Sequence, residues 1–133
     1  MTSRVRRTAW ILTAFYAAFH FVMTHLPPGT IPQPRVRDKT LHFLSYGLLS
    51  GLLYIALWLG GATIARAAIL VLTINAIFGA LDELLQAPVG RTPEFADWVV
   101  DLAAAVVAVT CFSLLRAIMR KSDKPPVTIA PGD

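Results

Sequence analysis

Hydrophobic residues form four long blocks along the chain, and short polar segments separate them. The blocks cover residues 8–26, 41–60, 67–81 and 99–119. A membrane-spanning helix needs about 20 mostly apolar residues, and each block reaches this length once its flanking turns are added. The pattern therefore predicts an all-α integral membrane bundle of four transmembrane helices, over residues 8–26, 39–60, 64–86 and 97–118.

The composition favours a membrane protein over a soluble domain. Of the 133 residues, 56% are hydrophobic and only 15% are charged, whereas soluble domains carry about 25% charged residues. The mean hydropathy is +0.61. We expect a single domain over residues 1–119, followed by a polar, proline-rich tail over residues 120–133 that has too few apolar residues to fold.

The first block also has features of a secretory signal, which begins with basic residues and continues into an apolar core. Its apolar run is longer than the usual run of about 7–15 residues, and no clear small-x-small cleavage site precedes Pro27. We therefore expect a retained first helix. The single cysteine, Cys111, lies within the fourth block and excludes an intrachain disulfide.

Four helices place both termini on one side of the membrane, and the basic residues indicate which side. Cytoplasmic segments carry the excess of Lys and Arg, so both termini are expected in the cytoplasm. Eight basic residues lie on the terminal side, namely Arg4, Arg6, Arg7, Arg66, Arg116, Arg120, Lys121 and Lys124, and four on the other, namely Arg35, Arg37, Lys39 and Arg91. Topology and attraction to anionic membrane lipid explain the positive net charge, so nucleic acid is not an expected partner.

Polar residues gather at the helix ends that are predicted to face outward. In the second helix, Asp38, His42 and Tyr46 are spaced by four and share a face, with Tyr46 about 12 Å deeper than Asp38. Acids near the hydrocarbon boundary are costly unless they are paired, so we expect either a ligand-binding pocket or a structural polar network. The residues expected there are Asp38, Lys39, His42, Tyr46, Asp82, Glu83, Gln86, Arg91, Asp97 and Asp101.

Other polar residues have simpler expected roles. We expect His20 and His25 to hydrogen-bond neighbouring groups rather than to bind a ligand, and Asn75 to join helices within the membrane. Trp98 is expected to anchor the fourth helix at the membrane interface. Gly47, Ser50 and Gly51 form a face of small residues on the second helix, which would allow another helix to approach closely.

The segments "DKTLHFLSYG" and "DELLQAPVGRTPEFADWVVD" resemble the VanZ-like family of small bacterial membrane proteins, and the resemblance covers roughly residues 38–110. Asp101 departs from the family pattern because asparagine is usual there, and "LAAA" follows where a glycine is common. The matching positions are Asp38, Lys39, His42, Tyr46, Asp82, Glu83, Gln86, Arg91 and Asp97. The resemblance implies a multi-pass protein of the bacterial inner (cytoplasmic) membrane. The family's namesake is linked to low-level resistance to the glycopeptide teicoplanin, and the family supplies no accepted reaction.

Several functions fit these residues. The leading hypothesis is recognition of a lipid headgroup or a lipid-linked wall precursor, with Lys39, His42 and Arg91 contacting phosphate or carboxylate. A second is a hydrolase or transferase acting on a phosphate-bearing lipid, with His42 or Glu83 as the catalytic group and the carboxylates holding Mg²⁺ or Ca²⁺. No other cofactor is indicated. Transport and a scaffold role in an envelope complex remain as further alternatives.

Overall fold

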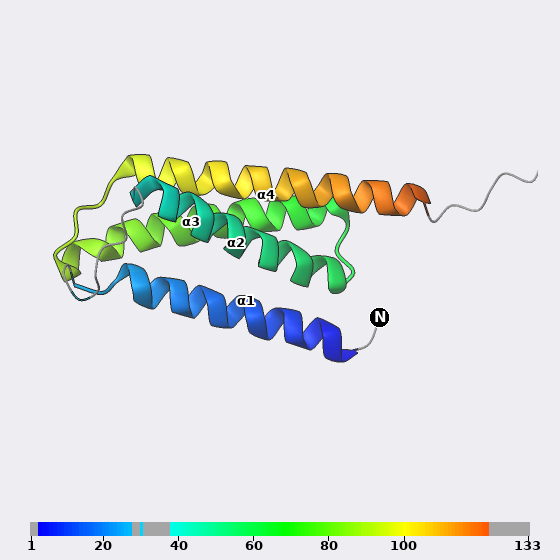
Figure 1. Ribbon diagram of the computed structural model, residues 1–133, viewed down its shortest axis with the longest axis horizontal. Helices are drawn as coiled ribbons and strands as arrows, with labels where there is room; N and C mark the ends of the chain where they lie inside the picture. Colours follow the sequence, from blue (N-terminus) through cyan, green and yellow to red (C-terminus); the bar gives the residue numbers. More distant parts are fainter. Residues whose placement is uncertain (1–2, 28–29, 31–37, 123–133) are drawn as a thin grey trace, which may run out of the picture.

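The computed structural model describes residues 3–27, 30 and 38–122. Over these residues the chain forms four α-helices, α1 (Ser3–Thr24), α2 (Asp38–Leu59), α3 (Ile64–Gln86) and α4 (Phe95–Ser122), and the short 3₁₀ helix η1 (Ala87–Val89). The long helices run alternately up and down along a common direction (Figure 1). Helix α2 packs against all three others, whereas in the described part of the chain α1 does not contact α4. The predicted all-α fold with four helices is confirmed.

Short capping motifs end the helices and set the connections. After α2, the amide of Gly61 donates to Trp58 O at 2.9 Å and the amide of Ala62 donates to Leu57 O at 3.0 Å. This pair of bonds is a Schellman motif, and Gly61 supplies its left-handed residue with φ 87°. Thr63 then caps α3, since its Oγ1 accepts a hydrogen bond from the Arg66 amide. These local signals make the tight turn between α2 and α3.

The connection from α3 to α4 uses a similar device. Pro88 lies in η1, and Gly90 follows with φ 80°. The Gly90 amide donates to Ala87 O at 3.1 Å and the Arg91 amide donates to Gln86 O at 3.2 Å. The connection thus reverses the chain and brings the start of α4 beside the end of α3.

Three of the helices are long and apolar enough to cross a membrane. The candidate spans are Lys39–Leu59, Ile64–Val89 and Phe95–Ser122. Helix α1 is 22 residues long but is not among them. Its apolar residues are interrupted by three arginines at its start and by polar or amphipathic side chains such as Tyr16 and His20. At the other end of the chain, α4 extends through Ser122, so the first residues of the predicted tail are helical, and residues 123–133 lie outside the described residues.

Small residues allow α2 and α4 to pack closely. A methyl group added at Gly51 would lie 2.9 Å from Phe112 Cε2, and one added at Gly47 would lie 3.9 Å from Ala104 Cβ. The predicted small-residue face of α2 is therefore used inside the bundle. Away from these contacts, large apolar side chains such as Phe15, Leu84 and Ile118 are exposed, as expected for surfaces that lie against lipid.

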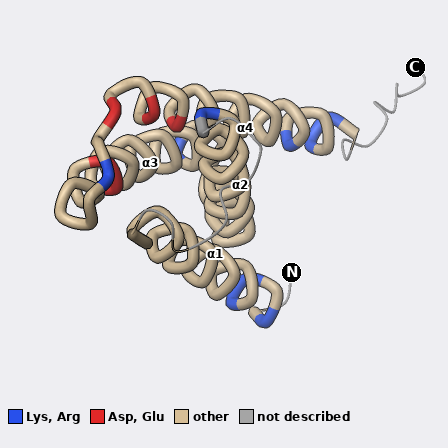
Figure 2. Tube along the Cα trace, turned by 60° about the vertical axis from the view of Figure 1, so that its left-hand side comes forward, with Lys and Arg blue, Asp and Glu red and all other residues tan. Residues whose placement is uncertain are grey.

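The charged residues separate to opposite ends of the bundle. Figure 2 shows the acidic residues around the α3–α4 connection and the start of α4, and most basic residues at the far end. We call the first of these the acidic end. By their positions at the end of α3, in the connection and at the start of α4, its carboxylates include Asp82, Glu83, Glu94, Asp97 and Asp101.

Candidate functional site

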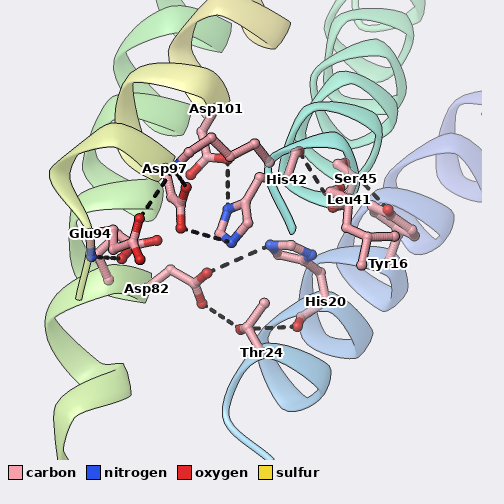
Figure 3. Close-up of polar contacts among 12 residues, drawn as sticks. Tyr16, His20, Thr24, Leu41, His42, Ser45, Asp82, Glu94, Asp97 and Asp101 are labelled. Carbon is pink, nitrogen blue, oxygen red and sulfur yellow. Dashed lines mark hydrogen bonds and ion pairs between the residues drawn. The ribbon is translucent and has the colours of Figure 1, made fainter. Parts of the chain in front are cut away.

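His42 links α2 to α4 inside the acidic end. Its Nδ1 lies 3.1 Å from Asp101 Oδ1, and its Nε2 lies 3.8 Å from Asp97 Oδ2. All three side chains are buried. Figure 3 shows the imidazole pointing between the two carboxylates. The i, i+4 spacing of Asp97 and Asp101 puts both acids on the face of α4 that packs against α2.

Asp82 provides a second centre of polar contacts, and its partners come from the end of α1 and from the residue that follows it. Thr24 Oγ1 donates to Asp82 Oδ1 at 2.6 Å. His20 Nε2 lies 3.8 Å from Asp82 Oδ2, and His25 Nδ1 lies 3.6 Å from Asp82 Oδ1. The Asp82 side chain is fully buried. The end of α1 is therefore joined to α3 through one carboxylate.

Tyr46 connects these two centres. The His20 ring meets the Tyr46 ring edge to face with centroids 4.8 Å apart, and the His42 ring lies parallel to it at 6.4 Å. Tyr46 is fully buried. We use the name polar cluster for the residues brought together in this way and for Glu83 beside them: His20, Thr24, His25, His42, Tyr46, Asp82, Glu83, Asp97 and Asp101.

Glu83 is held by the backbone at the start of α4. Its Oε2 accepts a hydrogen bond from the Glu94 amide at 2.9 Å, one turn before the buried Asp97. At the edge of the cluster, the half-exposed Lys39 side chain donates to Asp97 Oδ1 at 2.7 Å and to Glu94 Oε2 at 3.1 Å. The amide and the lysine therefore fix the positions of the acids that lie nearest to the surface.

Several buried polar atoms of the cluster have no hydrogen-bond partner among the described residues. They include Glu83 Oε1, Asp101 Oδ2, Asp82 Oδ2 and His20 Nε2. Folded proteins pair the large majority of such atoms with protein groups or ordered water. A group of unpaired polar atoms at one end of a bundle therefore indicates a place where an ion, a ligand or water binds.

Three cluster residues lie close enough together that they could hold a metal ion. His42, Glu83 and Asp101 each offer one ligand atom, and these atoms lie within 4.8 Å of one another. The three residues come from three helices, α2, α3 and α4. All three are buried.

The structure assembles most of the predicted site residues but not all of them. His42, Tyr46, Asp82, Glu83, Asp97 and Asp101 come together, and Lys39 lies at the edge. Gln86 is buried one turn from Asp82, and its Nε2 has no partner among the described residues. The Arg91 side chain makes no hydrogen bond or ion pair within the described ranges. The side chain of Asp38 lies outside the described residues.

Other expectations need correction. Asn75 does not join helices by its amide nitrogen, which donates to Val71 O of its own helix at 2.8 Å. Trp98 donates to Ala76 O of α3 at 3.0 Å, so it also ties α4 to α3. Its place at the membrane interface stays a prediction. His25 hydrogen-bonds a neighbouring group as expected, with its Nδ1 2.7 Å from Phe21 O, and His20 and His25 also lie beside Asp82. Thr24 was not expected in the site. The i, i+4 spacing of His20 and Thr24 in an apolar helix is the signal that could have identified them.

The fold and the site define an all-α protein with three candidate membrane-spanning helices and a buried polar cluster at one end. Comparisons with family models, with curated proteins and with solved structures find no match to the chain. The similarity of its two segments to VanZ-like proteins therefore remains a prediction.

Proposed function

We propose that the chain is a four-span protein of the bacterial cytoplasmic membrane whose polar cluster binds the phosphate-bearing headgroup of a lipid or of a lipid-linked wall precursor. Both termini lie in the cytoplasm, and the acidic end faces outward. The charge distribution supports this orientation, since the basic residues Arg4, Arg66 and Arg120 lie at the other end of the bundle. Helix α1 is proposed as the fourth span.

The observation that carries the proposal is the set of buried polar atoms in the cluster that lack a hydrogen-bond partner among the described residues, above all Glu83 Oε1 and Asp101 Oδ2. Ionisable groups inside a membrane bundle are costly, and they are usually retained because they serve a pathway or a site. Here they come from every helix of the bundle and gather at its acidic end, which the proposed orientation puts at the level of the outer headgroups. Glu83 Oε1 and Asp101 Oδ2 have no protein donor among the described residues, which leaves both oxygens available to a bound group or to water.

Two basic side chains are placed to attract an anionic headgroup. Lys39 is half exposed at the edge of the cluster. Arg91 follows η1 and Gly90 in the α3–α4 connection and is partly exposed, and its guanidinium makes no ion pair in the described part of the chain. An arginine that is not held by a protein carboxylate is available to a phosphate, which it can bind through two parallel hydrogen bonds.

Native mass spectrometry of the detergent-purified protein with bacterial envelope lipids tests the proposal. The protein is expected to retain one class of phosphate-bearing lipid, and Arg91→Ala and His42→Ala are expected to lose it. Arg120→Ala, the same change as Arg91→Ala at the opposite end, is the matched control and should keep it. The same nonspecific lipids on all four proteins would contradict the proposal.

The resemblance to VanZ-like proteins extends the proposal to glycopeptide susceptibility. Cells that express the chain are expected to survive a higher teicoplanin concentration than cells expressing Arg91→Ala at equal protein level. Equal survival of the two strains would contradict the proposed effect on glycopeptide susceptibility.

A second candidate function is hydrolysis or group transfer on the same phosphate-bearing lipid. The buried pairing of His42 with Asp101 favours it, because a carboxylate that holds an imidazole in one orientation is a common arrangement for a general base. Release of phosphate or of a headgroup from defined lipids, abolished by His42→Ala, would support catalysis. Metal-independent lipid binding without turnover would exclude it.

A further inference from the structure

The polar cluster has an excess of buried carboxylates over cations. Asp82, Glu83, Asp97 and Asp101 are all buried, whereas Lys39 pairs only with Asp97 among them. Arg91 makes no ion pair within the described residues. Buried carboxylates need a compensating charge or strong hydrogen bonds. His20, His25 and His42 also face these acids and add positive charge only when they are protonated. With neutral histidines, a cation bound among the acids would balance the cluster.

The geometry points to a divalent metal site formed by His42, Glu83 and Asp101. Their ligand atoms lie within 4.8 Å of one another. In a zinc site with bonds of about 2.1 Å, ligand atoms lie about 3.4 Å apart, so binding would draw the three side chains together. The proposed ion deepens the proposed function and depends on it for its role, because the ion would supply positive charge to a headgroup phosphate.

Two carboxylate oxygens are available for this role. Glu83 Oε2 is occupied by the Glu94 amide at 2.9 Å, which orients the side chain and leaves Oε1 without a partner among the described residues. Asp101 Oδ1 contacts His42, and Asp101 Oδ2 is likewise unpartnered. Glu83 and Asp101 are 6% and 1% exposed. In a cluster of surface acids, the carboxylates would be exposed, and no backbone amide or imidazole would hold them in one orientation.

The donor set indicates which metals fit. Mg²⁺ and Ca²⁺ prefer sites made of oxygen ligands, whereas an imidazole nitrogen with carboxylates suits first-row ions such as Zn²⁺. This differs from the Mg²⁺ or Ca²⁺ expected from the acids alone, because the structure brings His42 into the group. Asp97 Oδ2, at 3.8 Å from His42 Nε2, is a further carboxylate within reach.

Zinc binding to the purified full chain tests the site. Protein stripped with a chelator and freed of added lipid is titrated with Zn²⁺ alone by calorimetry, and its retained metal is measured by mass spectrometry. We expect about one Zn²⁺ per chain, at least tenfold preference over Mg²⁺, and at least tenfold weaker zinc binding in Glu83→Gln and Asp101→Asn. Glu94→Gln removes a neighbouring exposed carboxylate and should bind zinc as the native chain does.

Two results would overturn the metal site. One is native protein that binds no zinc; the other is Glu94→Gln weakening the binding as much as Glu83→Gln, which would show attraction to surface acids. A rise in melting temperature on adding zinc, present in the native chain and in Glu94→Gln but absent in folded Glu83→Gln, separates lost binding from lost folding. Lipid retention by the chelator-stripped protein separates the two proposals. Zinc binding without a retained lipid class would contradict only the headgroup site. A retained lipid class without zinc binding would contradict only the metal site.

Discussion

His42 Nδ1 on α2 lies 3.1 Å from Asp101 Oδ1 on α4, and both residues are buried. The two residues are 59 positions apart in the sequence. The contact joins the most extensively packed pair of helices at the level of the polar cluster. A hydrogen bond to a charged group in a buried setting stabilises more than one at the surface, and its loss leaves a desolvated group without a partner.

A double-mutant cycle on this pair should reveal the coupling. His42→Ala is expected to lower the free energy of unfolding, and the loss should be larger by about 1.5–3 kcal/mol when Asp101 is present than in the Asp101→Ala background. Reversible unfolding in mixed detergent micelles measures all four proteins. Additive effects of the two substitutions would mean that the contact contributes nothing.

Thr24 is expected to hold the end of α1 against α3. Thr24→Val keeps the shape of the side chain but removes the hydroxyl that donates to the buried Asp82 at 2.6 Å. The expected cost is about 1.5–3 kcal/mol in the free energy of unfolding, since the acceptor is a carboxylate. Thr110→Val is the matched control, because the exposed Thr110 hydroxyl donates only to Val106 O of its own helix. Equal stability of the two variants would contradict the role of Thr24.

The absence of a side chain at Gly79 leaves space for neighbouring residues of the polar cluster. A methyl group at Gly79 would lie 3.2 Å from Trp98 Cδ1, 3.4 Å from Asp101 Oδ2 and 3.5 Å from Tyr46 Cε1. Gly79→Ala should therefore destabilise the fold by about 1–3 kcal/mol through overpacking and should weaken zinc binding, because it presses on the proposed ligand Asp101.

Gly47→Ala is the control for this prediction. Its added methyl group would meet only Ala104 Cβ, at the ordinary contact distance of 3.9 Å. Because alanine favours the helix by about 0.5–1 kcal/mol over glycine, this variant should be as stable as the native chain or more stable. A Gly79→Ala variant that unfolds and binds zinc like Gly47→Ala would show that the site tolerates the extra volume.

The helices could be predicted from the sequence because apolar blocks of membrane length leave few alternatives. The predicted ranges 39–60 and 64–86 lie within one residue of α2 and α3 at each end. The acids of α3 and α4 could also be placed, since Asp82, Asp97 and Asp101 follow or precede clear turn signals such as Pro88 and Gly90. Their position near the helix ends follows from these local turn signals and does not depend on tertiary contacts.

The contribution of α1 could not be predicted in the same way. Lipid-facing and core-facing positions are both apolar in such a helix, so the pattern does not show which face turns inward. His20 and Thr24 reach Asp82 only because α1 is rotated to face α2 and α3. Among the described residues, Lys39 pairs with Asp97 whereas Arg91 pairs with no acid. This depends on the path of the α3–α4 connection, which local sequence does not determine.

The orientation of the acidic end relative to the membrane is tested most directly by cysteine accessibility in intact cells. In a Cys111→Ser background, single cysteines replace Ser3, Thr30, Thr92 or Ser122, and a membrane-impermeant maleimide is applied from outside. We expect Thr30→Cys and Thr92→Cys to be labelled, and Ser3→Cys and Ser122→Cys to be labelled only after the membrane is opened. Labelling of Ser3→Cys from outside would show that α1 does not span, and labelling of Ser122→Cys but not of Thr92→Cys would place the polar cluster on the cytoplasmic side, contrary to a site for outer-leaflet headgroups.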